Sequence, residues 1–362
     1  MTIPEVHLVA GGLRDSVLLA PVAAALRAGS LLSPIAVTCG RHPAAAGQTF
    51  SAFGLEPEVG MPGPAGDLAA RIGFLDNLWG ARMPAAVLVA GDSTTALAAA
   101  TAAQWRHIPV VHVDAGRRSA RLDAIEADRH LLAQLAAMHL VTTAPAAMNL
   151  LDERVPACDI LITGSTAVDA ALTLAARGLP YASQAVARAA RSGHRLILLT
   201  TREPGTDRLA QIICATRRLV QAHPDIEVVA SGHPAVRDPL TATLGALDRV
   251  TVAEPWPHQD LARLLREAYL VLTDPDGIEE VAPSFGVPAL VIDGAASSTI
   301  VREASRLLVS RLRRDSMTAG GNPYGDGLAA GRAAQATAAM LGLADRPEPM
   351  PGTVRPLRSA VS

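Results

Sequence analysis

The stretch PVVHVDAGRRS at residues 109–119 joins an apolar run to a charged ending. Its first half is rich in valine, a β-branched residue that is typical of buried strands. Asp114, Gly116 and Arg118 follow at once. In parallel α/β sheets, ligands bind just beyond the carboxyl ends of the strands. The residues after each predicted strand are therefore the first place to look for a functional site.

Apolar runs of this kind alternate with alanine- and leucine-rich helical stretches along the chain. We predict strands at 6–12, 34–40, 85–92, 109–116, 139–144, 159–165, 195–201, 226–233, 250–255, 269–276 and 288–293, with helices that include 16–28, 94–106, 123–138, 207–222, 259–267 and 327–341. The apolar runs are nearly continuous, as in parallel strands that are buried on both faces. Repeated β-α-β units predict the α/β class with doubly wound parallel sheets.

Two such domains are expected. Residues 176–194 carry no strand pattern, and we interpret them as the hinge. This places an N-terminal Rossmann-like domain at 1–176, a C-terminal one at 177–345 and a tail at 346–362. Two sheets that face one another would form a cleft lined by strand ends. Because neither half has G-x-G-x-x-G after a strand, we expect no nicotinamide or flavin cofactor.

Composition restricts the partners. The 362 residues are 49% hydrophobic with a net charge of −2, so no overall charge favours nucleic acid or a membrane surface. No apolar run is long enough to span a bilayer, and the start does not resemble a signal peptide. The scattered cysteines Cys39, Cys158 and Cys214 indicate reduced thiols rather than disulfides or a zinc site. We therefore expect a cytoplasmic protein without a bound metal.

The chain contains no lysine, so all 32 basic residues are arginine. This excludes Schiff-base chemistry on a lysine, whether with pyridoxal phosphate or with a carbonyl substrate. It also excludes the phosphate-loop lysine and the catalytic lysine of protein kinases. Any phosphate binding must rest on arginine, histidine, backbone amides and helix amino ends.

Two aspartates end predicted strands in the first half. Asp92 either caps the next helix or serves catalysis, and Ser93 could cap that helix instead. Asp114 is expected to point into the cleft, with Gly116 easing a turn and Arg118 forking onto phosphate oxygens. The alternative for Asp114 is an internal ion pair that holds its loop.

A helix follows with Glu126 and Arg129 three positions apart, and this spacing puts both on one face. Taken alone, such a pair is typical of a solvated surface. Only a location at the strand ends would make it part of a site.

In the second half, Asp276 and Gly277 open a turn after a predicted strand. The amides of Gly277 and Ile278 would then bind an anion at the start of a helix. Glu279 and Glu280 fall in its first turn, and one of them could bind ribose hydroxyls or simply cap the helix.

Three further side chains follow predicted strands and are weaker candidates. Arg202 and His233 belong to the second half, and His42 belongs to the first. Each could reach the cleft, although histidines are common where loops begin.

Several segments together resemble the non-hydrolysing UDP-N-acetylglucosamine 2-epimerases over nearly the whole chain. They are RHPAAAGQTFSAFGL, AGDSTTALAAATAA, IPVVHVDAGRRS, the helix ending in DR, ITGSTAVDAAL, LVLTDPDGIEEVAPSFGVPALV and NPYGDG. The resemblance implies two Rossmann-like domains of the GT-B type, with the nucleotide on the C-terminal one. It further implies a UDP-sugar as the partner, no cofactor and a homodimer.

The resemblance also implies a reaction. UDP would leave the sugar, a glycal would form, and UDP would add back after C2 is protonated on its other face. The catalytic carboxylates would be Asp92, Asp114 and Glu126, with Asp114 where the family usually has glutamate. Arg118 and Arg129 match conserved arginines of the family that would bind substrate.

Several positions differ from the family pattern. The first loop reads GGLRD, which moves its arginine by one position to Arg14 and replaces a lysine by Leu18. Ile125 stands in place of an acidic residue and Arg202 in place of the active-site histidine. Pro275 and Val281 replace a phosphate-binding serine and a ribose-binding glutamate. We expect Arg202 to take over part of the diphosphate binding.

The predicted function is therefore conversion of UDP-GlcNAc to UDP-ManNAc, or of a related UDP-sugar in specialised metabolism such as antibiotic biosynthesis. Alternatives are a hydrolysing 2-epimerase that releases UDP and free sugar, a non-catalytic homologue that binds sugar nucleotides, or a glycosyltransferase. The segment RHPAAAGQ keeps His42 of the family's regulatory substrate site but loses its charged neighbours. Activation by substrate should accordingly be weak or absent.

Overall fold

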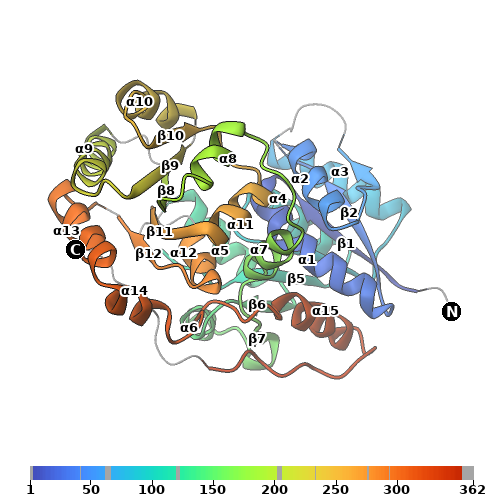
Figure 1. Ribbon diagram of the computed structural model, residues 1–362. Coiled ribbons are helices and arrows are strands. Elements are labelled where there is room, and N and C mark those ends of the chain that lie inside the picture. Colours follow the sequence, from blue (N-terminus) through green and yellow to red (C-terminus); the bar gives the residue numbers. More distant parts are fainter. Residues whose placement is uncertain are drawn as a thin grey trace. The chain divides into compact units, whose positions relative to one another are not determined.

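The chain forms two compact units, described here from a computed structural model (Figure 1). One unit runs to Ala170 and takes in Tyr324–Pro351, and the other is Ala171–Pro323. The structure describes residues 3–40, 42–61, 67–119, 123–201, 206–232, 234–274, 277–292 and 294–352.

The first unit is built on a parallel sheet whose strand order is β3-β2-β1-β4-β5-β6-β7. In chain order the strands are β1 (Glu5–Ala10), β2 (Ser33–Thr38), β3 (Val59–Gly60), β4 (Ala86–Ala90), β5 (Val110–Ala115), β6 (Met138–Val141) and β7 (Ile160–Ile162). The order reverses between β1 and β4, which is the Rossmann arrangement. Ligands of such sheets bind at the carboxyl ends beside this reversal, where the loops after β1 and β4 lie.

Helices connect these strands. They are α1 (Leu13–Gly29), α2 (Pro43–Ala52), α3 (Leu68–Ala81), α4 (Thr94–Trp105), α5 (Ala124–Leu135), α6 (Ala144–Asp152), the short 3-10 turn Ala157–Asp159 and α7 (Thr166–Ala176). Local sequence explains the starts of several. Asp67, Ser93 and Asp123 each accept a hydrogen bond from a backbone N–H of the helix that follows, and so cap α3, α4 and α5.

The second unit has a parallel sheet of order β10-β9-β8-β11-β12. Its strands are β8 (Arg195–Thr201), β9 (Ile226–Gly232), β10 (Val250–Ala253), β11 (Ala268–Thr273) and β12 (Ala289–Val291). Its helices are α8 (Gln184–Ala190), α9 (Thr206–Ala222), α10 (Pro234–Leu244), α11 (His258–Glu267), α12 (Ile278–Val281), α13 (Ser297–Val309) and α14 (Arg311–Thr318), with the 3-10 turn Ala282–Phe285 after α12.

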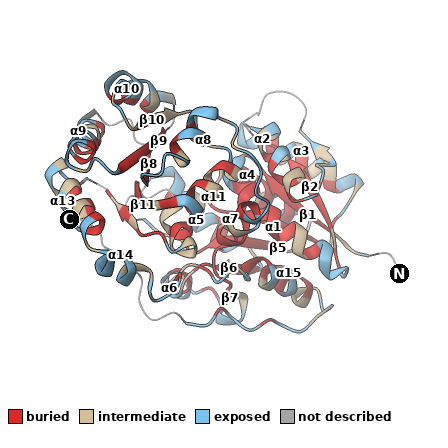
Figure 2. Cartoon of the chain, in the orientation of Figure 1, coloured by how far each residue is buried: buried red, intermediate tan, exposed pale blue. Residues whose placement is uncertain are grey.

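Each unit has its own hydrophobic core around its sheet (Figure 2). Every residue of β4 and of β9 is buried, as the continuous apolar runs predict. Helices on both faces exclude water from these strands, which is why their sequences do not alternate between apolar and polar. The predicted α/β class with two parallel sheets is confirmed.

The chain returns to the first unit after α14. The last helix, α15 (Ala329–Met340), packs against α1. Beyond it, the Met350 N–H donates to the Ile162 carbonyl at 2.7 Å, on the exposed edge of β7. Residues 324–345, which we expected in the C-terminal domain, thus pack with the N-terminal sheet. An apolar helix face is stable only when another surface covers it, and α1 covers that of α15.

Within the part of the chain that the structure describes, no helix has both the length and the apolar character needed to cross a membrane. The described residues also contain no group of three or more histidine, cysteine or acidic side chains placed to hold a metal ion.

Candidate active site

The loop after β4 presents Asp92. Gly91 has φ +65°, which turns the chain sharply, and Ser93 accepts the Ala96 N–H at 3.1 Å. Ser93 is therefore the cap of α4, so the Asp92 carboxylate is left for other partners. Of the two interpretations of Asp92, helix capping is the one that the structure does not support.

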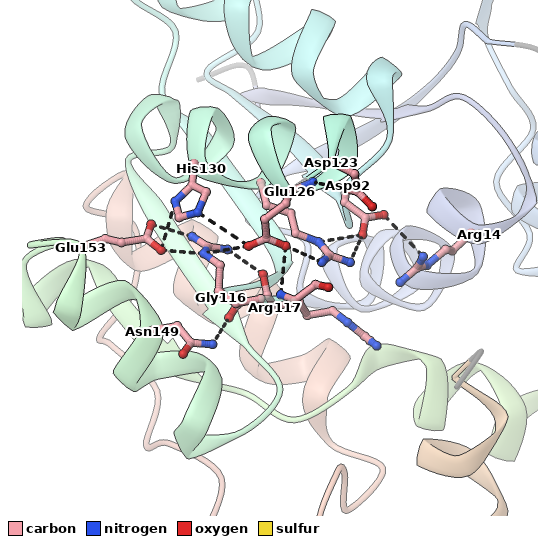
Figure 3. Close-up of polar contacts among 12 residues, drawn as sticks. Arg14, Asp92, Gly116, Arg117, Asp123, Glu126, His130, Asn149 and Glu153 are labelled. Atoms are coloured by element: carbon pink, nitrogen blue, oxygen red, sulfur yellow. Dashed lines mark hydrogen bonds and ion pairs between the residues drawn. The ribbon is translucent and has the colours of Figure 1, made fainter. Parts of the chain in front are cut away.

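Asp92 is held between two arginines (Figure 3). Its Oδ2 accepts from Arg129 Nε and Nη2 at 3.0 and 2.6 Å, and its Oδ1 lies 3.4 Å from Arg14 Nη1. Burial favours the neutral acid, but the positive charge of Arg14 and the hydrogen bonds from Arg129 outweigh it and lower the pKa of Asp92. Asp92 is thus ionised at neutral pH.

Glu126 belongs to the same cluster. Its Oε2 accepts from Arg129 Nη1 at 2.8 Å and from the Ser119 N–H at 2.9 Å, and its side chain is only 3% exposed. The pair of Glu126 and Arg129 is therefore not a solvated helix pair. Because α5 begins beside the ends of β4 and β5, the spacing of three residues brings both side chains to the strand ends.

Asp114, the next-to-last residue of β5, has an unusual backbone conformation. Its φ is +59°, in the left-handed region that costs a non-glycine residue about 1–2 kcal/mol. The pairing of β5 with β6 is irregular at this point, between Val113 and Ala115. The carboxylate is 4% exposed, accepts from Thr142 Oγ1 at 3.0 Å and lies 3.4 Å from Arg117 Nη1. A long contact to Arg117 is thus present, but it is not a tight internal ion pair.

Gly116 is required by packing rather than by a ligand. It has φ +77°, and a Cβ at this position would lie 2.3 Å from the Ala146 carbonyl oxygen of α6. Its own carbonyl accepts from Asn149 Nδ2 at 2.9 Å. The loop after β5 is therefore pressed onto α6 and can take no other residue here without rearrangement.

Arg118 is fully engaged within the first unit. Its Nε and Nη2 donate to the two oxygens of Glu153 at 2.5 and 2.6 Å, and its Nη1 donates to the Arg117 carbonyl at 2.6 Å. The Arg118 guanidinium, which we expected to bind phosphate, is thus paired with the carboxylate of Glu153, the residue that directly follows α6. Binding of phosphate by Arg118 would first require this pair to open.

Sequence reasoning missed two members of this cluster. Glu153 also lies 3.2 Å from His130 Nδ1, while His130 Nε2 lies 3.6 Å from Glu126 Oε1 (Figure 3). The spacing of four between Glu126 and His130 on one helix was an available signal. No sequence pattern pointed to Glu153, which directly follows α6, whereas Glu126 and His130 lie on α5.

Two buried residues hold the strand-end loops in place. Asp15 accepts from the Gly11 N–H and from Ser93 Oγ, both at 2.9 Å, and so ties the loop after β1 to the loop after β4. His112, buried in β5, has Nε2 2.7 Å from the Gly91 carbonyl. Burial lowers the pKa of His112, so its imidazole is neutral and donates from Nε2.

The remaining candidates of the first unit are more open. The Arg14 side chain is 45% exposed, and among the described residues it is paired with Asp92. His42 is exposed at the start of α2, and its N–H donates to the Gly11 carbonyl at 3.4 Å. Both therefore lie next to the loop after β1 and are accessible to a ligand.

In the second unit, the Gly277 N–H donates to Glu279 Oε2 at 2.8 Å, so the amide that we expected to bind an anion is already used. Ile278 begins α12, which has four residues, and Glu280 is buried. Arg202, His233 and Asp276 lie outside the residues that the structure describes.

Comparison with known proteins identifies the family. The model of the family described as "UDP-N-acetylglucosamine 2-epimerase" matches residues 24–338. The chain belongs to the UDP-N-acetylglucosamine 2-epimerase family. An enzyme of that name from Escherichia coli K12 is 34% identical over 288 residues, covering 70% of this chain and 75% of that protein.

Solved structures of the 2-epimerase family agree with this assignment. A Listeria monocytogenes protein superposes with a TM-score of 0.89 at 30% identity, over 97% of this chain and all of the other. The Neisseria meningitidis UDP-GlcNAc 2-epimerase, crystallised with UDP-GlcNAc, has a TM-score of 0.81 at 26% identity, over 90% and 97%. The resemblance seen in the sequence is confirmed, and so is membership of a family of enzymes.

Proposed function

We propose that this protein converts UDP-GlcNAc to UDP-ManNAc, or epimerises a related UDP-sugar at C2. The Neisseria meningitidis relative binds UDP-GlcNAc, which supports this class of substrate. The observation that carries the proposal is the junction at Arg129, which joins Asp92 and Glu126 at the strand ends of the first unit. Buried carboxylates gathered at a strand end are suited to proton transfer.

The proposed reaction balances without a redox step. The C1–O bond breaks and its electron pair leaves with UDP, while a carboxylate takes the proton from C2, so that a glycal forms. A second carboxylic acid then delivers a proton to the opposite face of C2, and UDP adds back at C1. Two acid–base groups on opposite faces of the sugar are therefore needed.

Asp92 and Asp114 fit these two roles. Asp92 is ionised because Arg14 and Arg129 lower its pKa, and it can accept a proton. Asp114 is the next-to-last residue of the neighbouring strand β5 and is buried, which allows a short transfer path. Glu126 would set the orientation of Arg129 and take part in proton movement. Arg129 then stabilises the developing charge.

The arginine best placed to meet a leaving diphosphate is Arg14, because nearly half of its side chain is accessible and its contact to Asp92 is long. His42 would contribute to substrate binding beside it. We further propose that the nucleotide is bound by residues after the strands of the second unit, among them Arg202, His233, Asp276, Ile278 and Glu280, and by Gly277 once its N–H is released from Glu279. Assembly as a homodimer is part of the same proposal.

The test is incubation of the protein with UDP-GlcNAc in deuterium oxide, followed at C2 by NMR. Incorporation of deuterium together with the manno product is the expected result. Absence of both would refute the proposed reaction. A coupled assay for free UDP distinguishes the hydrolysing alternative, in which UDP accumulates and UDP-ManNAc does not.

A further inference from the structure

A pocket of about 510 Å³ lies in the first unit between the loop after β1 and the starts of α3 and α4. Gly12, Arg71 and Thr94 are on its walls. Its volume falls within the roughly 300–1,000 Å³ that is usual for small-molecule sites.

Arg71 is the unusual member of this wall. It is buried, with an exposed fraction of 6%, and its Nε, which is inaccessible to solvent, has no hydrogen-bond partner. Among the described residues, no carboxylate lies within ion-pair distance of its guanidinium. An arginine keeps its proton in proteins, and burial of its charge without a partner is unfavourable. Within the described part of the chain, Arg71 therefore has no counter-charge at ion-pair distance.

The backbone around the pocket favours a negative charge. Three helices, α1 with 17 residues, α3 with 14 and α4 with 12, begin on its walls. Helix amino ends carry partial positive charge and free N–H groups. Gly12, at the start of α1, supplies no side-chain cap, so the first amides of this helix are not bonded to a capping side chain.

The two carboxylates on the pocket wall are directed elsewhere. Asp15 accepts from Gly11 and Ser93, and burial raises the pKa of Asp15. Asp67 caps α3 by accepting the Ala70 N–H at 2.9 Å. Neither is paired with Arg71, so the guanidinium still has its capacity to bind an external anion.

We propose that this pocket binds a phosphoryl oxyanion, with Arg71 as the cation and the amino ends of α1 and α4 as the surrounding donors. Tetrahedral phosphoryl oxygens match both the guanidinium fork and helix amides. The ligand is a phosphate or diphosphate group, supplied either by a sugar nucleotide or by a free anion. The sugar-nucleotide source rests on the proposed function, whereas the free-anion source does not.

The test is binding of inorganic pyrophosphate and of UDP to the full chain, measured by calorimetry and by the shift in Tm. Arg71→Met should weaken binding of at least one of these by tenfold or more. Because the variant removes an unpaired buried charge, its Tm without anion should equal or exceed that of the wild type. A purely structural role for Arg71 predicts a lower Tm instead.

A matched control removes an arginine of the same charge from an exposed helix position. Arg218 of α9 is exposed, so Arg218→Met should leave both affinities unchanged. If Arg71→Met loses UDP binding, the bound phosphoryl group belongs to a nucleotide. If it loses only pyrophosphate binding, the ligand is a free anion. Equal affinity of Arg71→Met and wild type for both would overturn the proposal.

A second variant keeps the proposal testable if Arg71→Met does not fold. Gly12 has extended backbone, and a side chain there meets nothing within 4 Å. Gly12→Asp should fold, since aspartate is a favoured helix cap, and it should repel an anion from the pocket. Unchanged binding in this variant would also count against the site. If the protein binds the anion but incorporates no deuterium at C2 of UDP-GlcNAc, the proposed reaction is refuted while the proposed anion site is retained.

Discussion

Arg129 donates from Nε and Nη2 to the same oxygen of Asp92, at 3.0 and 2.6 Å, across 37 positions of the chain. Since the third nitrogen of the guanidinium, Nη1, contacts Glu126, one arginine holds two carboxylates in fixed orientation. Burial by itself would favour the neutral acid, so ionisation of Asp92 depends on the positive charge of Arg14 and on this contact with Arg129.

Arg129→Gln should therefore raise the pKa of Asp92 and move the acidic limb of the pH–rate profile of kcat/KM to higher pH. It should also destabilise the fold by about 2–3 kcal/mol at neutral pH, somewhat less than a fully buried pair would. A carboxyl group whose pKa is lowered by folding stabilises the folded state at pH values above its pKa in the unfolded chain. The stability difference between wild type and variant should consequently shrink as the pH falls below about 4.

The measurements for Arg129→Gln are a pH–rate profile and urea unfolding at several pH values. Arg106→Gln is the control, because its partner Asp76 lies on the surface away from Asp92. It should change neither the rate nor the acidic limb. An unchanged acidic limb in Arg129→Gln would contradict the role given to this pair.

Asp114→Asn should reduce kcat by about 100-fold or more, because a general acid–base group contributes roughly 10²–10⁴. Asparagine tolerates the left-handed backbone of this position and can still accept from Thr142, so Tm should change little. Steady-state kinetics and a thermal melt give the two readouts. Full activity of the Asp114→Asn variant would show that Asp114 transfers no proton.

Gly116→Ala should destabilise the first unit strongly, by more than about 2 kcal/mol, since its Cβ would collide with the Ala146 carbonyl and its φ is positive. Urea unfolding measures the change. Gly73→Ala is the matched control: this glycine lies within α3, and a Cβ there meets nothing within 4 Å. The control should be neutral or stabilising by up to about 1 kcal/mol.

Asp169→Asn should alter the pH dependence of stability. Burial raises the pKa of Asp169 to about 6, and its Oδ1 accepts the Ala330 N–H at the start of α15 at 2.8 Å. Because its pKa is higher in the folded state, the contribution of Asp169 to stability is fully present below the unfolded value of 3.8 and is lost as pH rises through about 6.

In Asp169→Asn, that loss should disappear while the contact to Ala330 remains possible. The difference corresponds to roughly 3 kcal/mol at most, from about two pKa units. Tm measured from pH 4 to pH 8 decides the matter. A variant whose Tm falls with pH as steeply as that of the wild type would show that Asp169 is not the group responsible.

The strands can be predicted from the sequence because the apolar run that forms each one is continuous along the chain. Each run, such as the one that ends at Asp114, carries its own apolar composition, and burial between helices requires that composition wherever the strand pairs. The positions of Asp92 and Asp114 at strand ends follow directly, since a residue that comes after a parallel strand lies at the carboxyl edge of the sheet.

The partner of each charged side chain could not be predicted in this way. Arg118 fits a phosphate ligand equally well by residue type, but Glu153, 35 positions away, occupies its fork. The packing of α15 against α1 could not be predicted either, because an alanine-rich apolar face can pack against many surfaces.

The sequence by itself determined the two parallel-sheet units, the absence of lysine chemistry, the family, and which acidic residues follow the strands. Only the tertiary structure decided that Arg129 joins Asp92 to Glu126, that Arg118 is paired with Glu153, and that Arg71 is buried with no described carboxylate at ion-pair distance. The physical reason is range. Strand and helix patterns arise from neighbours along the chain, whereas ion pairs and burial depend on residues that folding brings together from distant positions.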